Sequence, residues 1–547
     1  MTCPFFIPSD IANMEHILHT EPLQESRPHS SFQRVEDPEE IEESYSGYLQ
    51  DESRFKGRAD RIAFPEIEAD VLHLVRSAVS SAQPITVSSA RTGITGAGVP
   101  VGGTLVSMER MDHILEIRKD ERSENRCMRC QPGLSLERLE RILTGKDSPN
   151  GPPELFESDF WADAPEWFYP PDPTEKTAHL GGTAATNASG SRSFHYGPTR
   201  NFIRGLRIVL SNAGVLALNR GDVWLHAGDS VRIQGPDGVI EWTVPDFRMP
   251  PVKHAAGYHL ASPMDLIDVF IGSEGTLGIL TEVDILLQRR PECVFGLLSF
   301  FRSDDAALRF VRSIKTTTVG RIAPAALEYF DPNALQLLRD APSERVRSFP
   351  TDTAAAIYSE QHCARVEADG CMEAYGDFIT RWDSEILDTW AATDSRELEV
   401  LTAFRHAVPE TVNAQIGRLQ RDIPELRKIG TDFAVPDEAF SEMMRVSRQR
   451  LEQSGIQHIG FGHIGDNHVH INLVPSDPEE LDRAKSLYED LAREAVRLGG
   501  TVSAEHGIGK LKKSILRLLY AGPEMQKLAN VKAAFDPKGL FGPGNMI

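Results

Sequence analysis

From about Ile62 onward, apolar residues alternate along the chain between helix-like spacing and strand-like runs. Over residues 66–81 the apolar positions recur close to the helical period, and residues 84–87 form a short run typical of a buried strand. After Pro291 the run CVFGLLSFF indicates a strand, DDAALRFVRSI a helix and AALEYF a further strand. A polar stretch at about 375–425 indicates helix and precedes another strand-like unit, TDFAVP. This mixture predicts an α+β or α/β protein.

Length and charge narrow the classes of function. The chain has 547 residues, enough for roughly two to four domains. Its net charge of −22 provides no basic field for nucleic acid and no charge-driven docking on an anionic membrane. No apolar run approaches the roughly 18–20 residues of a spanning helix, so we expect no transmembrane segment.

Cysteines and the amino terminus favour the cytoplasm. Six cysteines are few for this length, which favours a reducing compartment over a disulfide framework. Cys127 and Cys130 form a lone CxxC with no second ligand pair nearby, so we interpret it as structural. The first residues lack a basic start followed by an apolar core, and residues 1–40 predict an extension over the surface. We expect a cytoplasmic protein, with peripheral attachment to a membrane left open.

Three segments rich in glycine and small residues indicate an anionic ligand. They cover residues 88–103, 170–197 and 271–279, and strand-like runs flank them. Glycine lets successive N–H groups converge on a phosphate, and Ser and Thr add hydroxyl donors. The chain has neither a GxGxxG after a strand nor a GxxxxGK[ST], so a dinucleotide would bind here by another architecture.

The segment GIQHIGFGHIGDNHVHINLVP, residues 455–475, predicts a β-hairpin. Centred on Asp466-Asn467, it pairs His463 with His470 on one face, close enough for two imidazoles to share a divalent metal. Asn472 lies on the same strand face as His470. Ordinary polar strand residues are the alternative interpretation.

A second segment, TVSAEHGIGK, strengthens the metal hypothesis. Glu505 is a candidate third ligand and His506 a candidate base, since two histidines and one carboxylate form a known catalytic metal arrangement. A zinc hydrolase built on these ligands is a competing interpretation. Arg405 is a candidate for holding a carboxylate, although sequence physics alone favours a surface position for it.

These motifs resemble a known family. TGITGAGVP, PPDPTEKTAHLGGTAATNASG, YGPTRNFIRGLRIVL and GSEGTLGI resemble the FAD-binding domain shared by vanillyl-alcohol oxidase and p-cresol methylhydroxylase. The carboxy-terminal half resembles the D-lactate, glycolate and D-2-hydroxyglutarate dehydrogenase branch, with its GHxGDGNxH pattern and later Glu-His-Gly-Ile-Gly. The implied fold is α+β, with a two-subdomain FAD-binding domain and a substrate (cap) domain holding an antiparallel sheet. The expected divisions are an extension at 1–40, the FAD-binding domain at 41–290, the cap domain with the metal site at 291–500, and a helical segment returning to the flavin at 501–547.

The resemblance implies roles for individual residues. Around the FAD pyrophosphate it places Thr92, Gly93, Thr95, Gly96 and Gly98. Along the flavin it places Pro171, Asp172, Thr174, Gly181, Gly182, Asn187, Gly190, Ser191, Tyr196, Gly197, Glu274, Gly275, Gly278 and Ile279. The metal ligands would be His463, His470 and Glu505, with Asn472 near the substrate, His506 as base and Arg405 on the substrate carboxylate.

The chain departs from the family pattern at four places. The pyrophosphate loop usually begins with Arg and three glycines, where this chain has Ser88, Ser89, Ala90 and Arg91. His468 adds an imidazole where the family's GDGN has Asn. Gly430 replaces a lysine that holds the distal carboxylate of a diacid in some relatives, and Lys428 is displaced by two positions. The final proline-glycine turn has Gly542 and Asn545 instead of the usual Asn and Lys.

The implied activity is an FAD-dependent, metal-assisted dehydrogenation of a D-2-hydroxyacid to the 2-oxo acid. Because of Gly430, D-lactate is the first substrate expected, followed by D-2-hydroxyglutarate and glycolate. The metal would be zinc or manganese, the FAD non-covalently bound, and the electron acceptor a quinone, a cytochrome or an electron-transfer flavoprotein. A homodimer and a non-catalytic flavin-bearing subunit both stay open.

Overall fold

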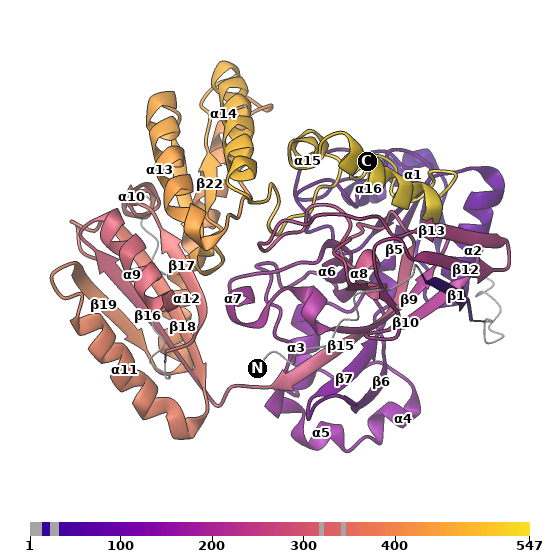
Figure 1. Ribbon diagram of the computed structural model, residues 1–547, viewed down its shortest axis with the longest axis horizontal. Coiled ribbons are helices and arrows are strands. Elements are labelled where there is room, and N and C mark those ends of the chain that lie inside the picture. Colours follow the sequence, from indigo (N-terminus) through magenta and orange to yellow (C-terminus); the bar gives the residue numbers. More distant parts are fainter. Residues whose placement is uncertain (1–13, 22–31, 317–321, 341–345) are drawn as a thin grey trace.

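A computed structural model describes residues 14–21, 32–316, 322–340 and 346–547 (Figure 1). Most of the expected extension, and Cys3 with it, lies outside these ranges. Its described part includes strand β1 (Glu15–His19), which pairs in parallel with β12 (Ser230–Gly235). Within the described ranges, no helix combines the length and the apolar character needed to cross a membrane.

A small, mostly parallel sheet carries the first glycine-rich segment. Its order is β2 (Arg34–Val35), β3 (Arg61–Ala63), β5 (Thr104–Ser107) and β4 (Ile85–Ser88). Helix α2 (Glu68–Ser81) packs on it through Val71, Leu72 and Val75, which are at most 2% exposed. The periodicity therefore predicted both α2 and β4 to within two residues, and the loop at 88–103 begins where β4 ends.

A second, antiparallel sheet carries the other two glycine-rich segments. Its order is β10 (Val215–Asn219), β9 (Ile203–Val209), β15 (Ile279–Arg289), β7 (Arg126–Cys130) and β6 (Ile114–Lys119). Cys127 and Cys130 lie on β7, both are buried and neither forms a disulfide, in keeping with a structural role. Strand β15 leads directly from this sheet into the next one (Figure 1).

The third sheet is wholly antiparallel and has seven strands. Its order is β19 (Ile386–Ala392), β16 (Cys293–Phe301), β18 (Ala355–Cys363), β17 (Pro324–Phe330), β21 (His458–Gly462), β22 (His470–Leu473) and β20 (Ile429–Gly430). Phe310 of α9 (Asp304–Thr316) and Phe378 of α11 (Ala368–Thr380) belong to one core beside it, and Leu335 of α10 (Pro332–Asp340) and Phe404 of α12 (Ser395–Asp422) to another. This confirms the predicted α+β fold with an antiparallel sheet in the carboxy-terminal half.

Two local predictions are wrong. The polar stretch at 375–425 is not one helix, because β19 separates α11 from α12 through an alternation of exposed and buried residues. In the hairpin, Phe461 rather than His463 pairs with His470. The chain leaves β21 at Gly462 and makes a 3₁₀ turn at Ile464–Asp466, with Asn467 in the left-handed region, so the connection is longer than a two-residue turn.

The carboxy-terminal segment returns to the first two sheets, where α15 (Lys513–Leu519) and α16 (Pro523–Phe535) lie beside them (Figure 1). The N–H groups of Lys510 and Leu511 donate to the carbonyl of Thr95, and Ile85 pairs with Phe541 in a parallel bridge. Lys510 Nζ donates to the carbonyls of Gly96 and Ala97. The last fifty residues thus hold the first glycine-rich loop in place.

Substitution of Gly509 by alanine is expected to loosen this closure. Gly509 has φ +51°, and a Cβ there would lie 2.3 Å from the Thr95 carbonyl oxygen. Gly455 has φ +67° and ψ 3° with open space around it, so Gly455→Ala is a matched control for the left-handed backbone alone. That backbone costs roughly 1–2 kcal/mol in both variants, and the clash adds about 1–3 kcal/mol only in Gly509→Ala. Thermal unfolding and retained flavin absorbance measure the difference, and equal effects of the two variants would contradict this closure.

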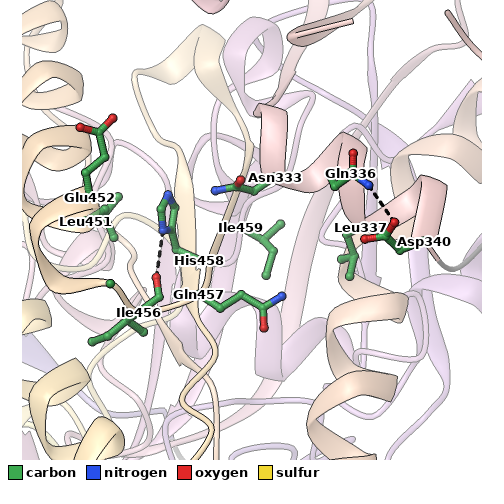
Figure 2. A pocket seen from close by; sticks show the side chains of 11 residues that line it. Asn333, Gln336, Leu337, Asp340, Leu451, Glu452, Ile456, Gln457, His458 and Ile459 are labelled. Carbon is green, nitrogen blue, oxygen red and sulfur yellow. Dashed lines mark hydrogen bonds between the residues drawn. The ribbon is translucent and has the colours of Figure 1, made fainter. Parts of the chain in front are cut away.

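A cavity of about 330 Å³ lies between α10, the end of α13 (Asp437–Ser454) and β21 (Figure 2). Polar side chains such as Asn333, Gln336 and His458 line it. It shares no residue with the histidine cluster described below.

Candidate active site

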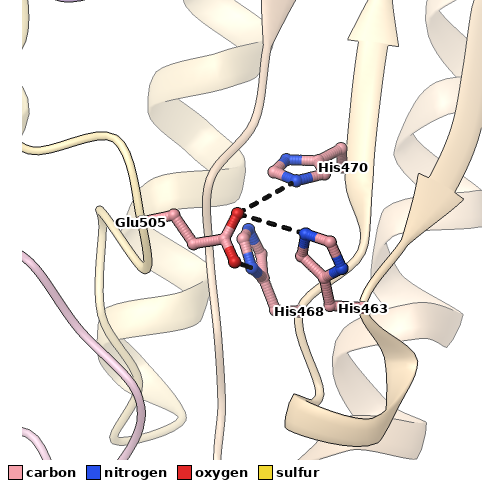
Figure 3. A group of neighbouring side chains, drawn as sticks. All are labelled: His463, His468, His470 and Glu505. Atoms are coloured by element: carbon pink, nitrogen blue, oxygen red, sulfur yellow. Dashed lines mark ion pairs between the residues drawn. The ribbon is translucent and has the colours of Figure 1, made fainter. Parts of the chain in front are cut away.

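Three histidines and one glutamate converge after β21. His463, His468 and His470 surround the carboxylate of Glu505, and one ligand atom from each lies within 4.8 Å of the others (Figure 3). Nε2 of His463 is 3.2 Å and Nε2 of His470 3.7 Å from Oε2 of Glu505. The fold thus brings together the three metal ligands expected from the sequence, although the hairpin register differs from the predicted one.

The outer nitrogens of two imidazoles face acceptors, which orients the inner ones. Nδ1 of His463 lies 2.6 Å from Oε1 of Glu328, a buried residue of β17. Nδ1 of His470 lies 3.1 Å from the carbonyl oxygen of Thr431. An acceptor behind a histidine fixes its tautomer and is the usual support of a metal-binding imidazole. The donor set of nitrogen and carboxylate oxygen therefore fits a divalent ion such as zinc or manganese.

The charged side chains of this group pair with one another. Glu328 and Glu505 raise the pKa of His463 to about 10, against the opposing effect of burial. Burial and the neighbouring His470 lower the pKa of His468 to about 3, so this imidazole is neutral. The pKa of Glu505 is held well below its usual value by His463 and Lys253, although burial opposes this.

Lys253 and Ser189 bring the flavin-side half of the chain to Glu505. The Lys253 ammonium contacts Glu505 and donates to Oδ2 of Asp466 and Oγ of Ser193. The Ser189 hydroxyl donates to Oε1 of Glu505 at 3.2 Å. The second glycine-rich segment and the histidine cluster therefore form one continuous site.

Asp432 is the central acceptor behind the Glu-His pair. It is 0% exposed and accepts hydrogen bonds from the backbone N–H groups of Glu505 and His506, each at 3.1 Å. Lys512 Nζ and Ser503 Oγ donate to it at 2.7 Å. Ion pairing holds the pKa of Asp432 well below its ordinary value despite burial.

His506 has the geometry of an oriented base. Its Nδ1 lies 3.3 Å from Oδ2 of Asp432, and its ring stacks on that of His470 at 5.2 Å between centroids. Its side chain is 28% exposed. Burial lowers the pKa of His506 although Asp432 opposes this, so the neutral, proton-accepting form predominates at neutral pH.

Arg405 is not the surface residue that sequence physics favoured. It lies on the inner face of α12, only 17% exposed, and its Nε donates to Oε2 of Glu328 at 3.3 Å. Arg405 and His463 therefore contact the same carboxylate, that of Glu328. The pattern of apolar positions in α12 did not reveal this contact. Asn472 is buried on β22, with its backbone paired to Ile459 and Gly430.

The first glycine-rich loop presents donors for a phosphate. The hydroxyls of Ser88 and Ser89 are buried and have no hydrogen-bond partner within the described residues. Buried hydroxyls without partners are costly, and phosphate oxygens would satisfy them. Gly96 has φ +74°, and its N–H donates to Asp51. Thr92, Gly93, Thr95 and Gly98 lie in the same loop. The serines that replace the family's usual Arg and glycines thus fit the pyrophosphate of FAD.

The second segment folds around Asp172. Its carboxylate accepts from the Arg192 N–H and the Ser191 hydroxyl, both at 3.1 Å. A Cβ at Gly190 would lie 2.0 Å from the Asp172 carbonyl oxygen, so this glycine permits close packing of the chain on itself. The Tyr196 hydroxyl lies 2.7 Å from Nδ1 of His362 on β18. The remaining expected residues of this segment are Pro171, Thr174, Gly181, Gly182, Asn187 and Gly197.

The third segment anchors the carboxy terminus. Glu274 is buried at φ +53°, and its carboxylate accepts from the N–H groups of Ile508 and Gly509 at 2.6 and 2.7 Å. Burial raises the pKa of Glu274 to about 7. Gly275, Gly278 and Ile279 follow it into β15. Glu274 therefore positions the Glu-His-Gly-Ile-Gly loop, a contact that the resemblance did not indicate.

Sequence reasoning missed the supporting residues Glu328, Asp432 and Lys253. Glu328 stands in AALEYF as the one acid of an otherwise apolar strand, and this is the signal that would have marked it. Asp432 is the second residue of TDFAVP and follows β20 outside any strand, so this signal does not mark it. Lys253 has no comparable mark.

Comparisons with known proteins agree with this arrangement. Residues 59–151 and 159–219 match the model described as an FAD binding domain, and residues 291–546 match the carboxy-terminal domain of FAD linked oxidases. The glycolate oxidase subunit GlcD of Bacillus subtilis is 27% identical over 522 residues, covering 94% of this chain and 95% of that protein. A D-lactate dehydrogenase of Anaerostipes hadrus is 26% identical, covering 93% of each chain. A D-2-hydroxyglutarate dehydrogenase of Stutzerimonas stutzeri is 24% identical, covering 92% of this chain and 95% of that one.

A solved structure shares the fold. Alkyldihydroxyacetonephosphate synthase superposes with a TM-score of 0.61 at 17% identity, over 93% of this chain and 82% of that one. Fold and matched domains together define an FAD-dependent oxidoreductase acting on CH–OH groups. The chain belongs to the vanillyl-alcohol oxidase and p-cresol methylhydroxylase superfamily, and its relatives there include D-lactate and D-2-hydroxyglutarate dehydrogenases and a glycolate oxidase subunit.

Proposed function

We propose that the chain oxidises a D-2-hydroxyacid to the 2-oxo acid with a divalent metal at His463, His470 and Glu505. The observation that carries this proposal is the convergence of these ligands with His506, in contact with a flavin-side segment through Ser189. When bound, the FAD supplies a two-electron acceptor and the metal a Lewis acid. The zinc-hydrolase alternative does not account for the FAD-binding region.

In this scheme His506, Arg405 and Asn472 act on different parts of the substrate. His506 takes the proton of the substrate α-hydroxyl, and Asp432 orients its ring through Nδ1. Arg405 holds the substrate carboxylate with the part of its guanidinium that Glu328 leaves free. Asn472 lies on the strand that carries His470 and adds a polar contact near the substrate.

A short monocarboxylic substrate such as D-lactate is the first choice. Gly430, where some relatives carry a lysine for a distal carboxylate, is exposed and offers no charge to a second carboxylate. D-2-hydroxyglutarate and glycolate follow. We further propose non-covalent FAD, a cytoplasmic location, and electron transfer to a quinone, a cytochrome or an electron-transfer flavoprotein.

Anaerobic bleaching of the flavin tests the proposal. Purified protein is mixed with a panel of D- and L-2-hydroxyacids, with and without prior treatment by a metal chelator. We expect one D-acid to bleach the flavin and chelation to abolish the bleaching, since the α-hydroxyl is then no longer activated. Reloading with Zn²⁺ or Mn²⁺ is the control for the treatment. A yellow protein that no hydroxyacid bleaches would be a non-catalytic flavin-bearing subunit, and the proposed chemistry would fall.

A further inference from the structure

His468 has the surroundings of a ligand rather than of a structural histidine. It is 0% exposed, and neither ring nitrogen makes a hydrogen bond of good geometry within the described part of the chain. A wholly buried imidazole whose ring nitrogens lack well-formed hydrogen bonds is costly unless a ligand binds it. Its Nδ1 lies 3.9 Å from Oε1 of Glu505, and its ring centroid is 4.3 Å from that of His470.

His468 also repeats the arrangement of the two expected histidine ligands. Each of the three imidazoles turns one nitrogen toward the Glu505 carboxylate, His463 and His470 toward Oε2 and His468 toward Oε1 (Figure 3). The other nitrogen of each ring faces an oxygen behind it. For His463 that oxygen belongs to Glu328 and for His470 to the Thr431 backbone. For His468 it is Oδ1 of Asp432, 3.1 Å from Nε2. A carboxylate behind an imidazole is the common support of a metal-binding histidine.

We propose that His468 is a fourth protein ligand, so that three imidazoles and one carboxylate hold the metal. This inference rests on the metal-assisted function proposed above, and it concerns a residue that stands where the family pattern has Asn.

The added ligand has a consequence for the choice of metal. Four protein ligands and two oxygens of a 2-hydroxyacid bring the count to six, which Mn²⁺ accommodates. Zinc with four protein ligands usually forms a closed, structural site. We therefore expect the Mn²⁺-loaded protein to react faster than the Zn²⁺-loaded one, and His468→Asn to reduce this difference.

Metal binding by His468→Asn tests the proposal without relying on turnover. Metal-free, flavin-loaded wild type and variant are titrated with Zn²⁺ and Mn²⁺ against a chromophoric chelator, and the zinc-loaded forms are measured by X-ray absorption. By X-ray absorption we expect three imidazoles at zinc in the wild type and two in the variant. By titration we expect the metal affinity of the variant to fall by more than the roughly 10- to 100-fold that loss of a supporting residue behind a ligand costs. His458→Asn, on β21 and outside the cluster, is the matched control and is expected to behave as wild type.

The outcomes separate this inference from the function on which it rests. Equal affinity and equal imidazole counts in wild type and His468→Asn would overturn the fourth ligand and leave the three-ligand site intact. A wild type that binds neither ion would overturn both. Flavin absorbance shows whether the variant is folded, and His468→Gln, which keeps the side chain larger, provides a second variant if His468→Asn loses its flavin.

Discussion

Alanine at His506 is expected to slow reduction of the flavin by a D-2-hydroxyacid by about 10²- to 10⁴-fold, the range of a lost general base. The His506 ring stacks on that of His470, and its Nδ1 faces Asp432. We expect no neighbouring side chain to take over its role as the base. Stopped-flow absorbance under anaerobic conditions measures the rate directly. The bound flavin is expected to stay at its wild-type level. The metal is expected to stay as well when His463, His470 and Glu505 hold it, whereas loss of metal would point to the second group of possible ligands, Asp432, His470 and His506.

Two further measurements distinguish a lost base from a general disturbance. Imidazole added in solution is expected to restore part of the rate in His506→Ala, since the side chain is 28% exposed and its removal leaves room for a small base. Alanine at His73, on the exposed side of α2, is the control and is expected to leave the rate unchanged. An unaltered rate in His506→Ala would assign the base to another residue.

Asp432→Ala is expected to lower the free energy of unfolding by about 3–5 kcal/mol, the cost of removing one partner of a buried ion pair. The change leaves the Lys512 ammonium, the Ser503 hydroxyl and two backbone N–H groups without their common acceptor. The loop carrying Glu505 and His506 then loses its fixed position, so both metal content and flavin reduction are expected to fall. Chemical denaturation followed by flavin fluorescence measures the stability.

Asp305→Ala provides the matched control for this loss. Asp305 is 73% exposed in its ion pair with Arg448, and its removal is expected to cost less than about 1 kcal/mol. If Asp432→Ala were no more destabilising than Asp305→Ala, Asp432 would not be the support of the Glu-His pair.

Sequence patterns predicted the elements whose environment is local. The period of apolar residues placed α2 and α9, because one face of each packs on a single core, and the continuous apolar run placed β16, whose two faces pack on different cores. The prediction for 375–425 failed because β19, a seven-residue edge strand with the sequence ILDTWAA, lies between two helices and is too short to stand out from the polar helical stretch around it. The hairpin register failed because Asn467 takes a left-handed conformation after a 3₁₀ turn, which a two-residue turn rule does not anticipate.

The residues of the candidate site also fall into two groups, those that sequence motifs predict and those that only the fold brings together. His463, His470, Glu505 and His506 are recognisable because their motifs are compact in sequence. Glu328, Asp432 and Lys253 reach the site from β17, from the segment after β20 and from the loop before the third glycine-rich segment, separated by 75 residues or more from one another along the chain. Only the packing of the third sheet against the flavin side brings them together, and no spacing rule encodes that contact.

The closure by the carboxy-terminal segment has a consequence for biogenesis. Asn545 donates to the carbonyls of Ala97 and Glu274, and Lys510 spans from the Gly96 carbonyl to the Asn545 side chain. The first and third glycine-rich loops are therefore joined by residues 508–511 and by Asn545, which are all synthesised long after both loops. We therefore expect the nucleotide cradle to be completed, and the cofactor to be held firmly, only once residue 545 has been synthesised.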